Sequence, residues 1–173
     1  HHEFGHFIVS EHDLSQGAFG EGYGDSLAIL INDDPVVGRD FQGVGSPVRD
    51  IVAANKQYPC FGEIHDCGQI LGGVWWDLRV HLGDSMGAVG LDYTRQLFTD
   101  WTGITVGGRG RSSAHPVTAV EVLTVDDDDA DLSNGTPNKD AICEAFAAHS
   151  IPCPGGCESI SNLRLTCRPG SFT

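Results

Sequence analysis

Apolar side chains recur every three or four residues between Glu63 and Leu82, and this pattern restricts the fold more than any other feature of the sequence. The apolar positions are Leu71, Val74, Trp75, Leu78 and Leu82. Because positions three and four apart share one face of an α-helix, the pattern predicts a helix that turns this face to a core. Gly72 and Gly73 lie within the segment and would let a neighbouring helix approach closely.

Other segments repeat the helical pattern, and the fold class that we expect is mainly α. The predicted helices are 2–10, 21–31, 89–101 and 115–125, with a short one within 48–54. Another helix is expected to begin at Thr136 and Pro137, with the threonine as cap and the proline in the first helical position, and to end near Pro152. Residues 32–62 are rich in proline and glycine and predict a long irregular segment, which in compact domains is often functional.

The cysteines indicate an oxidising compartment. The six cysteines lie at 60, 67, 143, 153, 157 and 167, and an even set of this size allows many pairings. We expect local disulfides between Cys60 and Cys67 and between Cys143 and Cys153, which leaves Cys157 with Cys167. A cysteine zinc site is the alternative, but the sequence has no C-x2-C pair. Disulfides predict a secreted, extracellular protein.

The charge balance argues against some classes of partner. The chain has 24 Asp and Glu against 10 Lys and Arg, a formal net charge of −14. Such a chain repels phosphate unless it has a basic patch, and none is found, so nucleic acid and anionic lipid are not expected as partners. No apolar run approaches the roughly 18 residues that cross a bilayer, and no signal peptide is seen. Since the chain opens on His1 without Met, we expect a piece of a longer protein.

Residues 2–6 read H-E-F-G-H, which has the form H-E-x-x-H. On a helix, His2 and His6 share a face, so both imidazoles can bind one zinc ion with Glu3 beside it. A hydrolytic zinc site needs three protein ligands and an open fourth position, so the third ligand must come from elsewhere. A chance match and the stub of a purification tag are the alternatives.

Glu21 is the candidate third ligand, because it opens the segment E-G-Y-G-D fifteen residues after His6. This spacing allows a turn that brings a second helix back against the first. Asp25, one helical turn later, is placed to accept the distal N–H of a ligand imidazole. A solvated helix-start glutamate is the alternative for Glu21. A phosphate loop is the alternative for the glycines, but the preceding strand and nearby cation that it needs are missing.

Together these motifs resemble the fungalysin-like branch of the thermolysin superfamily, the gluzincin metallopeptidases, whose pattern is H-E-x-x-H followed by E-x-x-x-D. Further matches are E-I-H-D-C-G-Q-I at 63–70, W-W-D-L at 75–78, D-L-S-N-G-T-P at 131–137 and A-F-x2-H at 145–149. The resemblance covers residues 1–150, and the combination is more specific than any single motif. It implies a secreted zinc endopeptidase acting on protein or peptide substrates.

The resemblance also implies a role for each matched residue. The zinc ligands are His2, His6 and Glu21, the general base is Glu3, the partner of the His2 imidazole is Asp25, and the hydrogen-bond donor to the developing oxyanion is His65. An aspartate a few residues upstream often orients this family histidine. Here Cys60 lies five residues before His65, which leaves Glu63 and Asp66 as alternatives. The family phenol near the oxyanion has no secure match.

The sequence changes character past Pro154, where two glycines follow, and we divide the chain there. Residues 1–154 correspond to the zinc helix and helical C-terminal lobe of a zincin-like domain. The N-terminal sheet lobe, whose edge strand binds the substrate, is absent from this chain, so we expect this piece alone to be inactive or weakly active. Residues 155–173 are expected to form a linker and the first strand of a truncated β-sandwich-like module, since a lone strand cannot satisfy its edge.

The acidic run 126–131 predicts a second metal site. Its candidate calcium ligands are Asp126, Asp128 and Asp131, although the run lacks the glycine and closing glutamate of an EF-hand, and a solvated acidic loop is the alternative. The second hypothesis for the whole chain is a non-catalytic extracellular module stabilised by zinc or calcium, within a large surface protein. An exopeptidase of the same superfamily is the third.

Overall fold

The structure is a computed structural model that describes residues 1–154. The expected Cys157–Cys167 pair and the expected first strand of a second module lie outside the described residues. Within them the fold is mainly α, as predicted, with one two-stranded sheet. The disulfides Cys60–Cys67 and Cys143–Cys153 are both formed, which confirms the two local pairs. No helix in residues 1–154 is long and apolar enough to cross a membrane.

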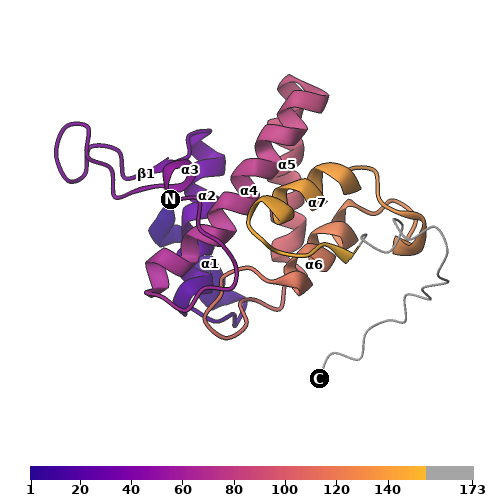
Figure 1. The fold of residues 1–173 in the computed structure, drawn as a ribbon, viewed down its shortest axis with the longest axis horizontal. Helices are drawn as coiled ribbons and strands as arrows, with labels where there is room; N and C mark the ends of the chain where they lie inside the picture. The colour runs from indigo at the N-terminus through magenta and orange to yellow at the C-terminus, as the bar shows by residue number, and fades with distance from the viewer. Residues whose placement is uncertain (155–173) are drawn as a thin grey trace.

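Helix α4 (Ile64–Met86) runs through the middle of the molecule, with α1 and α2 on one side and α6 and α7 on the other (Figure 1). Its predicted apolar stripe is buried, with every member at most 1 % exposed: Leu71, Val74, Trp75, Leu78 and Leu82. The glycine pair does admit close neighbours, since Gly72 faces Ile51 and Gly73 faces the ring of His149. The periodicity therefore identified the central element of the fold.

Helices α1 (His2–Glu11) and α2 (Gly17–Asn32) form an antiparallel pair that packs on α4. The two backbones nearly touch, because a Cβ added to Gly5 would lie 2.5 Å from Gly24 Cα. Helix α2 begins four residues before the predicted start at Glu21. Tertiary packing outweighs the low helix propensity of Gly17 and Gly20, so residues 17–20 become the first turn of the helix.

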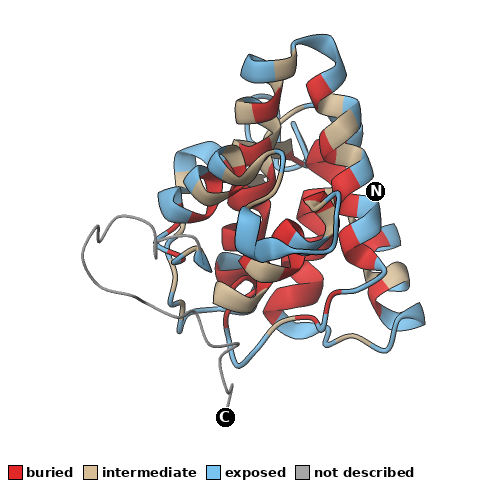
Figure 2. Cartoon of the chain, turned by 90° about the vertical axis from the view of Figure 1, so that its right-hand side faces the viewer, coloured by how far each residue is buried: buried red, intermediate tan, exposed pale blue. Residues whose placement is uncertain are grey.

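The remaining elements pack around α2 and α4, some directly and others through a neighbouring element. They are β1 (Val36–Val37), antiparallel to β2 (Arg49–Asp50), then α3 (Ile51–Ala54), α5 (Ala88–Thr102), α6 (Pro116–Asp126), the 3-10 turn η1 (Leu132–Asn134) and α7 (Lys139–Ala148). Buried residues gather where these helices meet (Figure 2). An aromatic cluster fills the junction of α2, α4 and α5, formed by Phe19, Tyr23, Trp75, Phe98 and Trp101.

The predicted start of the last helix is wrong. Helix α7 begins at Lys139 with Asn138 as its N-cap, rather than at Thr136 and Pro137. The buried carboxylate of Asp126 accepts hydrogen bonds from the backbone N–H and the side-chain amide of Asn138, each at 2.7 Å. This contact with the end of α6 fixes where α7 starts, so a long-range partner overrides the local capping signal.

Candidate metal centre

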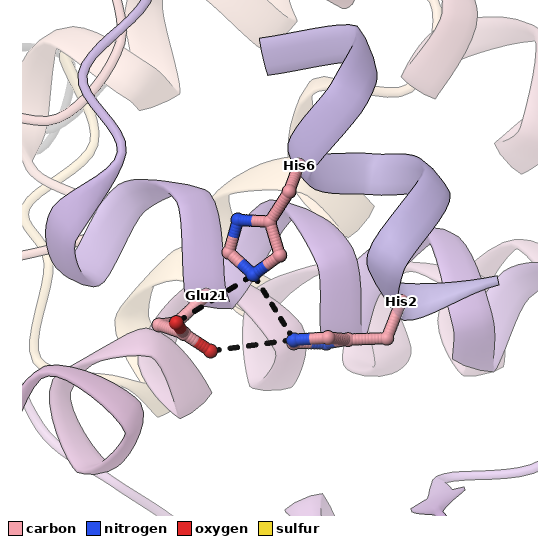
Figure 3. Close-up of side chains that lie close together, drawn as sticks. All are labelled: His2, His6 and Glu21. Carbon is pink, nitrogen blue, oxygen red and sulfur yellow. Dashed lines mark hydrogen bonds and ion pairs between the residues drawn. The ribbon is translucent and has the colours of Figure 1, made fainter. Parts of the chain in front are cut away.

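The α1–α2 pair brings His2, His6 and Glu21 together, with both imidazoles directed at the carboxylate (Figure 3). The two histidine Nε2 atoms are 3.2 Å apart. Glu21 Oε2 lies 3.3 Å from His2 Nε2, and Glu21 Oε1 lies 3.5 Å from His6 Nε2. The sequence therefore identified three side chains that converge on one point, and this group could hold a metal ion.

Glycines on α2 make room for the two imidazoles. A Cβ on Gly24 would lie 2.8 Å from His2 Nδ1, and a Cβ on Gly20 would lie 3.2 Å from His6 Nδ1. Both glycines lie inside a helix rather than in a loop before one. Gly20 and Gly24 are thus explained without a phosphate loop, because a larger residue at either position would push a ring away from Glu21, whereas Gly22 faces Gly68 and Leu71 of α4.

Asp25 holds the far side of the His2 ring, as the sequence predicted. Its Oδ1 lies 2.8 Å from His2 Nδ1, and the carboxylate is fully buried. This hydrogen bond raises the pKa of His2, although burial alone would lower it. Because the carboxylate oxygen is an acceptor, Nδ1 carries the proton, and in the neutral ring the Nε2 lone pair faces the cluster.

Arg49 is a member of the site that the sequence analysis missed. Its Nε donates to Asp25 Oδ2 and its Nη2 donates to Asp25 Oδ1, both at 2.7 Å. The two-residue strand β2 brings this side chain from the irregular segment to the buried Asp25 in the middle of α2. The only available signal was the expectation that this long segment is functional, since neither motif nor spacing singles out Arg49.

Gln16 holds the second imidazole and was also missed. Its Oε1 lies 2.9 Å from His6 Nδ1, while its Nε2 donates to the His6 carbonyl at 3.1 Å. The amide oxygen can only accept, so His6 Nδ1 also carries a proton and the neutral ring likewise turns the Nε2 lone pair inward. Two lone pairs thus approach each other beside a carboxylate, an arrangement suited to a cation.

The Glu21 carboxylate lacks the donors that a buried anion needs. The residue is 8 % exposed, and its Oε2 is buried without a hydrogen bond. The nearest nitrogens to Oε2 are His2 Nε2 and His65 Nε2, both at 3.3 Å. An unsatisfied buried acceptor is costly and rare, so this oxygen calls for a ligand that carries positive charge.

His65 lies beside the cluster, in the first turn of α4. Its Nδ1 is 2.7 Å from Glu63 Oε1, and the other carboxylate oxygen of Glu63 accepts the backbone N–H of His65 at 2.9 Å. The hydrogen bond to His65 holds the pKa of Glu63 below its usual range. Asp66, the other candidate for orienting His65, pairs with Lys56 instead at 3.1 Å. The structure thus places Glu63 in the orienting position.

An open hollow of about 590 Å³ adjoins this side of the cluster, and it is lined by both Arg49 and His65. Glu3 follows His2 on α1 and is exposed. Among the described residues, the ligand atoms that lie within 4.8 Å of one another at this centre belong to His2, His6 and Glu21, so Glu3 stands outside the ligand group. That placement is compatible with a base that acts beside the ion rather than on it.

The acidic run does not gather the three predicted calcium ligands. Asp126 is only 3 % exposed and accepts a further hydrogen bond from Tyr93 Oη at 2.9 Å. Asp131 accepts the N–H and the hydroxyl of Ser133 and so caps η1. The carboxylates that lie close together are those of Asp127, Asp128 and Asp129. Asp126 and Asp131 are held in helix ends, so only Asp128 of the predicted set belongs to the close group.

Comparisons with protein-family models, with curated protein sequences and with solved structures find no match for this chain. Function is therefore inferred from the atoms of the candidate metal centre and from the resemblance of its motifs.

Proposed function

We propose that this chain carries the zinc centre of a secreted endopeptidase that hydrolyses peptide bonds. The observation that carries the proposal is the convergence of His2 Nε2, His6 Nε2 and the buried, unsatisfied carboxylate of Glu21. Both rings are held at Nδ1 by acceptors, so the site is organised for a metal before any metal binds.

The spacing of the three donors fits a tetrahedral zinc ion. Ligand atoms that share one tetrahedral zinc ion at bond lengths of about 2.0–2.2 Å are about 3.3–3.6 Å apart. The measured separations are 3.2, 3.3 and 3.5 Å. Two imidazoles and one carboxylate are the ligand set of a catalytic zinc site that keeps its fourth position for substrate or water. His2 and His6 are both partly exposed, which leaves that position accessible.

In the proposed reaction each side chain has a separate task. A zinc ion held by His2, His6 and Glu21 would supply Lewis acidity for the scissile carbonyl and would lower the pKa of a bound water. Glu3 takes that proton on its carboxylate and passes it to the departing amine. His65, held at Nδ1 by Glu63, would donate from Nε2 in its imidazolium form to the carbonyl oxygen as negative charge develops there. Asp25 and Arg49 keep the His2 ring fixed throughout.

The partner implied by this chemistry is a polypeptide substrate, for which the hollow beside Arg49 and His65 is open. The resemblance adds an N-terminal sheet lobe that would form the opposite wall. The two disulfides are compatible with an extracellular location. Hydrolysis is therefore best measured in the full-length protein, and metal binding in the chain described above.

Metal stoichiometry tests the first half of the proposal. We expect one zinc ion per chain after dialysis against micromolar zinc, and none in His6→Ala. The matched control is His12→Ala, which removes an exposed histidine at the C-cap of the same helix. A chain that binds no zinc, or a His6→Ala variant that binds as much as the control, would overturn the zinc centre.

Hydrolysis tests the second half. In the full-length protein, Glu3→Gln should keep its zinc and lose about 100- to 10,000-fold in kcat, the contribution of a positioned acid or base. Glu11→Gln, an exposed change at the end of α1, should leave hydrolysis unaltered. Undiminished cleavage by Glu3→Gln would exclude Glu3 as the base.

A non-catalytic extracellular module stabilised by zinc is the second candidate. The exposure of Glu3, outside the ligand group, is the observation that favours it. Zinc binding without peptide hydrolysis by the full-length protein, under conditions where known zinc peptidases are active, would support this module over the peptidase.

A further inference from the structure

The side chains that present His65 to the centre are exposed to solvent. The Glu63 side chain is 59 % exposed and the His65 side chain 48 % exposed. Exposed ion pairs contribute little to stability, and the first turn of a helix frays more readily than its middle. The Glu63–His65 contact alone therefore cannot hold the imidazole 3.3 Å from Glu21 Oε2.

A disulfide closes the segment that carries both residues. Cys60 and Cys67 are seven residues apart, and Glu63 and His65 lie between them. Cys67 is fully buried, and its carbonyl accepts the hydroxyl of Ser113 at 2.6 Å. The backbone N–H of Cys60 donates to Ser112 Oγ at 3.2 Å. Both ends of the loop are thus attached to two consecutive serines.

The buried end of this loop abuts the metal ligand. Gly68 follows Cys67, and a Cβ on Gly68 would lie 2.9 Å from both Glu21 Cβ and the Gly22 nitrogen. The residue after the disulfide is therefore in direct contact with the backbone that carries the Glu21 carboxylate. Through Cys67, the bridge connects the exposed residues 61–63 to the part of α4 that packs directly against Glu21.

We propose that the Cys60–Cys67 disulfide is a positioning element for His65. The bridge keeps Glu63 in place, and through Glu63 it keeps the His65 imidazole close to Glu21. This inference rests on the proposed function, because it assigns to the disulfide a role in the reaction rather than in metal binding. The second disulfide, Cys143–Cys153, joins the middle of α7 to the residues that follow this helix and has no such relation to the centre.

The test compares two double variants of the full-length protein, Cys60→Ser/Cys67→Ser and the matched Cys143→Ser/Cys153→Ser. We expect the first to lose about 10- to 100-fold in kcat, part of the effect of removing one oxyanion donor, with KM and zinc stoichiometry unchanged. Amide exchange should accelerate at residues 63–66. The second variant should retain its kcat. Equal kcat losses in the two variants, or lost zinc in the first, would indicate a general structural role and overturn the inference.

A cycle with Glu63→Gln makes the test specific. If the disulfide acts through Glu63, removing the disulfide should change kcat little in a protein that already carries Glu63→Gln. The loss of kcat in the combined variant should then be much smaller than the product of the two separate losses. Losses that multiply would overturn the inference. The unmodified full-length protein separates the two claims. If it binds zinc but does not hydrolyse peptides, the proposed peptidase function is wrong, whatever the disulfide does. If it hydrolyses peptides and Cys60→Ser/Cys67→Ser does so equally, only the positioning role fails.

Discussion

Asp25 is the residue on which the order of the metal centre depends most. Its fully buried carboxylate lies between His2 and Arg49, and it bonds to both. A buried carboxylate without a counter-charge is expensive, so the guanidinium is what allows Asp25 to remain an acceptor for the His2 ring. The sequence predicted Asp25 from its place one turn after Glu21. It could not predict Arg49, because a side chain 24 positions later is brought in by a two-residue strand.

Removing Arg49 should therefore weaken metal binding without touching a ligand. We expect Arg49→Met to lower zinc affinity about 10- to 100-fold, the range for loss of a partner behind a ligand histidine, measured by competition with a chromophoric chelator. The matched control is Arg39→Met, which breaks an ion pair with Asp34 whose arginine is 61 % exposed. Equal affinities of the two variants would contradict this role of Arg49.

The ultraviolet absorbance of Tyr93 should report the contact of its hydroxyl with Asp126. Burial, followed by the hydrogen bond to Asp126, raises the pKa of Tyr93 from 10.0 to about 12. The folded protein keeps this proton while the unfolded chain loses it, so the contribution to stability is complete below pH 10 and is lost as the pH rises to about 12. Absorbance titration should show a late step for Tyr93 that is lost in Tyr93→Phe, whereas Tyr23, whose pKa is also raised by burial, still titrates late in that variant. A wild-type titration without that step would contradict the shift.

At the scale of elements, periodic apolar positions predicted where helices lie better than where they begin. The stripe on α4 identified its buried face, and α5 and α6 were predicted to within a residue at each end. The starts of α2 and α7 were misplaced, because each depends on a distant contact: Gln16 with His6 in one case, Asn138 with Asp126 in the other. The local sequence shows helix propensities and capping residues, but it does not show that Gln16 will contact His6 or that Asn138 will contact Asp126.

Asp126 should accordingly matter as a link between α6 and α7. Asp126→Ala leaves Tyr93 and Asn138 without their acceptor in a buried place, and we expect a loss of about 2–4 kcal/mol in the free energy of unfolding. The matched change Asp128→Ala, exposed in the same acidic run, should cost less than about 0.5 kcal/mol. Urea unfolding measures both, and similar losses would show that Asp126 is not a structural link.

At the scale of the molecule, the centre gathers buried negative charge in a chain of net charge −14. Bound zinc should therefore stabilise the fold. At free zinc one hundred times Kd the gain is about 2.7 kcal/mol, or about 5–10 °C in Tm for a chain of this size. A zinc-selective chelator should lower the Tm of the wild-type chain and leave that of His6→Ala unchanged. Equal shifts of Tm in the wild-type chain and in His6→Ala would show that the chelator acts at a site other than the candidate metal centre.

The same assay addresses the remaining calcium prediction. A calcium-selective chelator should lower Tm only if the close carboxylates Asp127, Asp128 and Asp129 hold an ion, and Asp128→Ala should then abolish the shift. A wild-type chain that is insensitive to this chelator would leave the run as a solvated acidic loop.

The pairing of α1 with α2 has a consequence for the order in which the protein matures. All three candidate ligands and Asp25 come from residues 2–25, so their contacts close over short stretches of chain and can form early in folding. His65 joins only when α4 packs on α2, and Arg49 only when β2 has formed. A growing chain can thus bring its candidate metal ligands together before it assembles the groups that, in the proposed reaction, would act on a peptide.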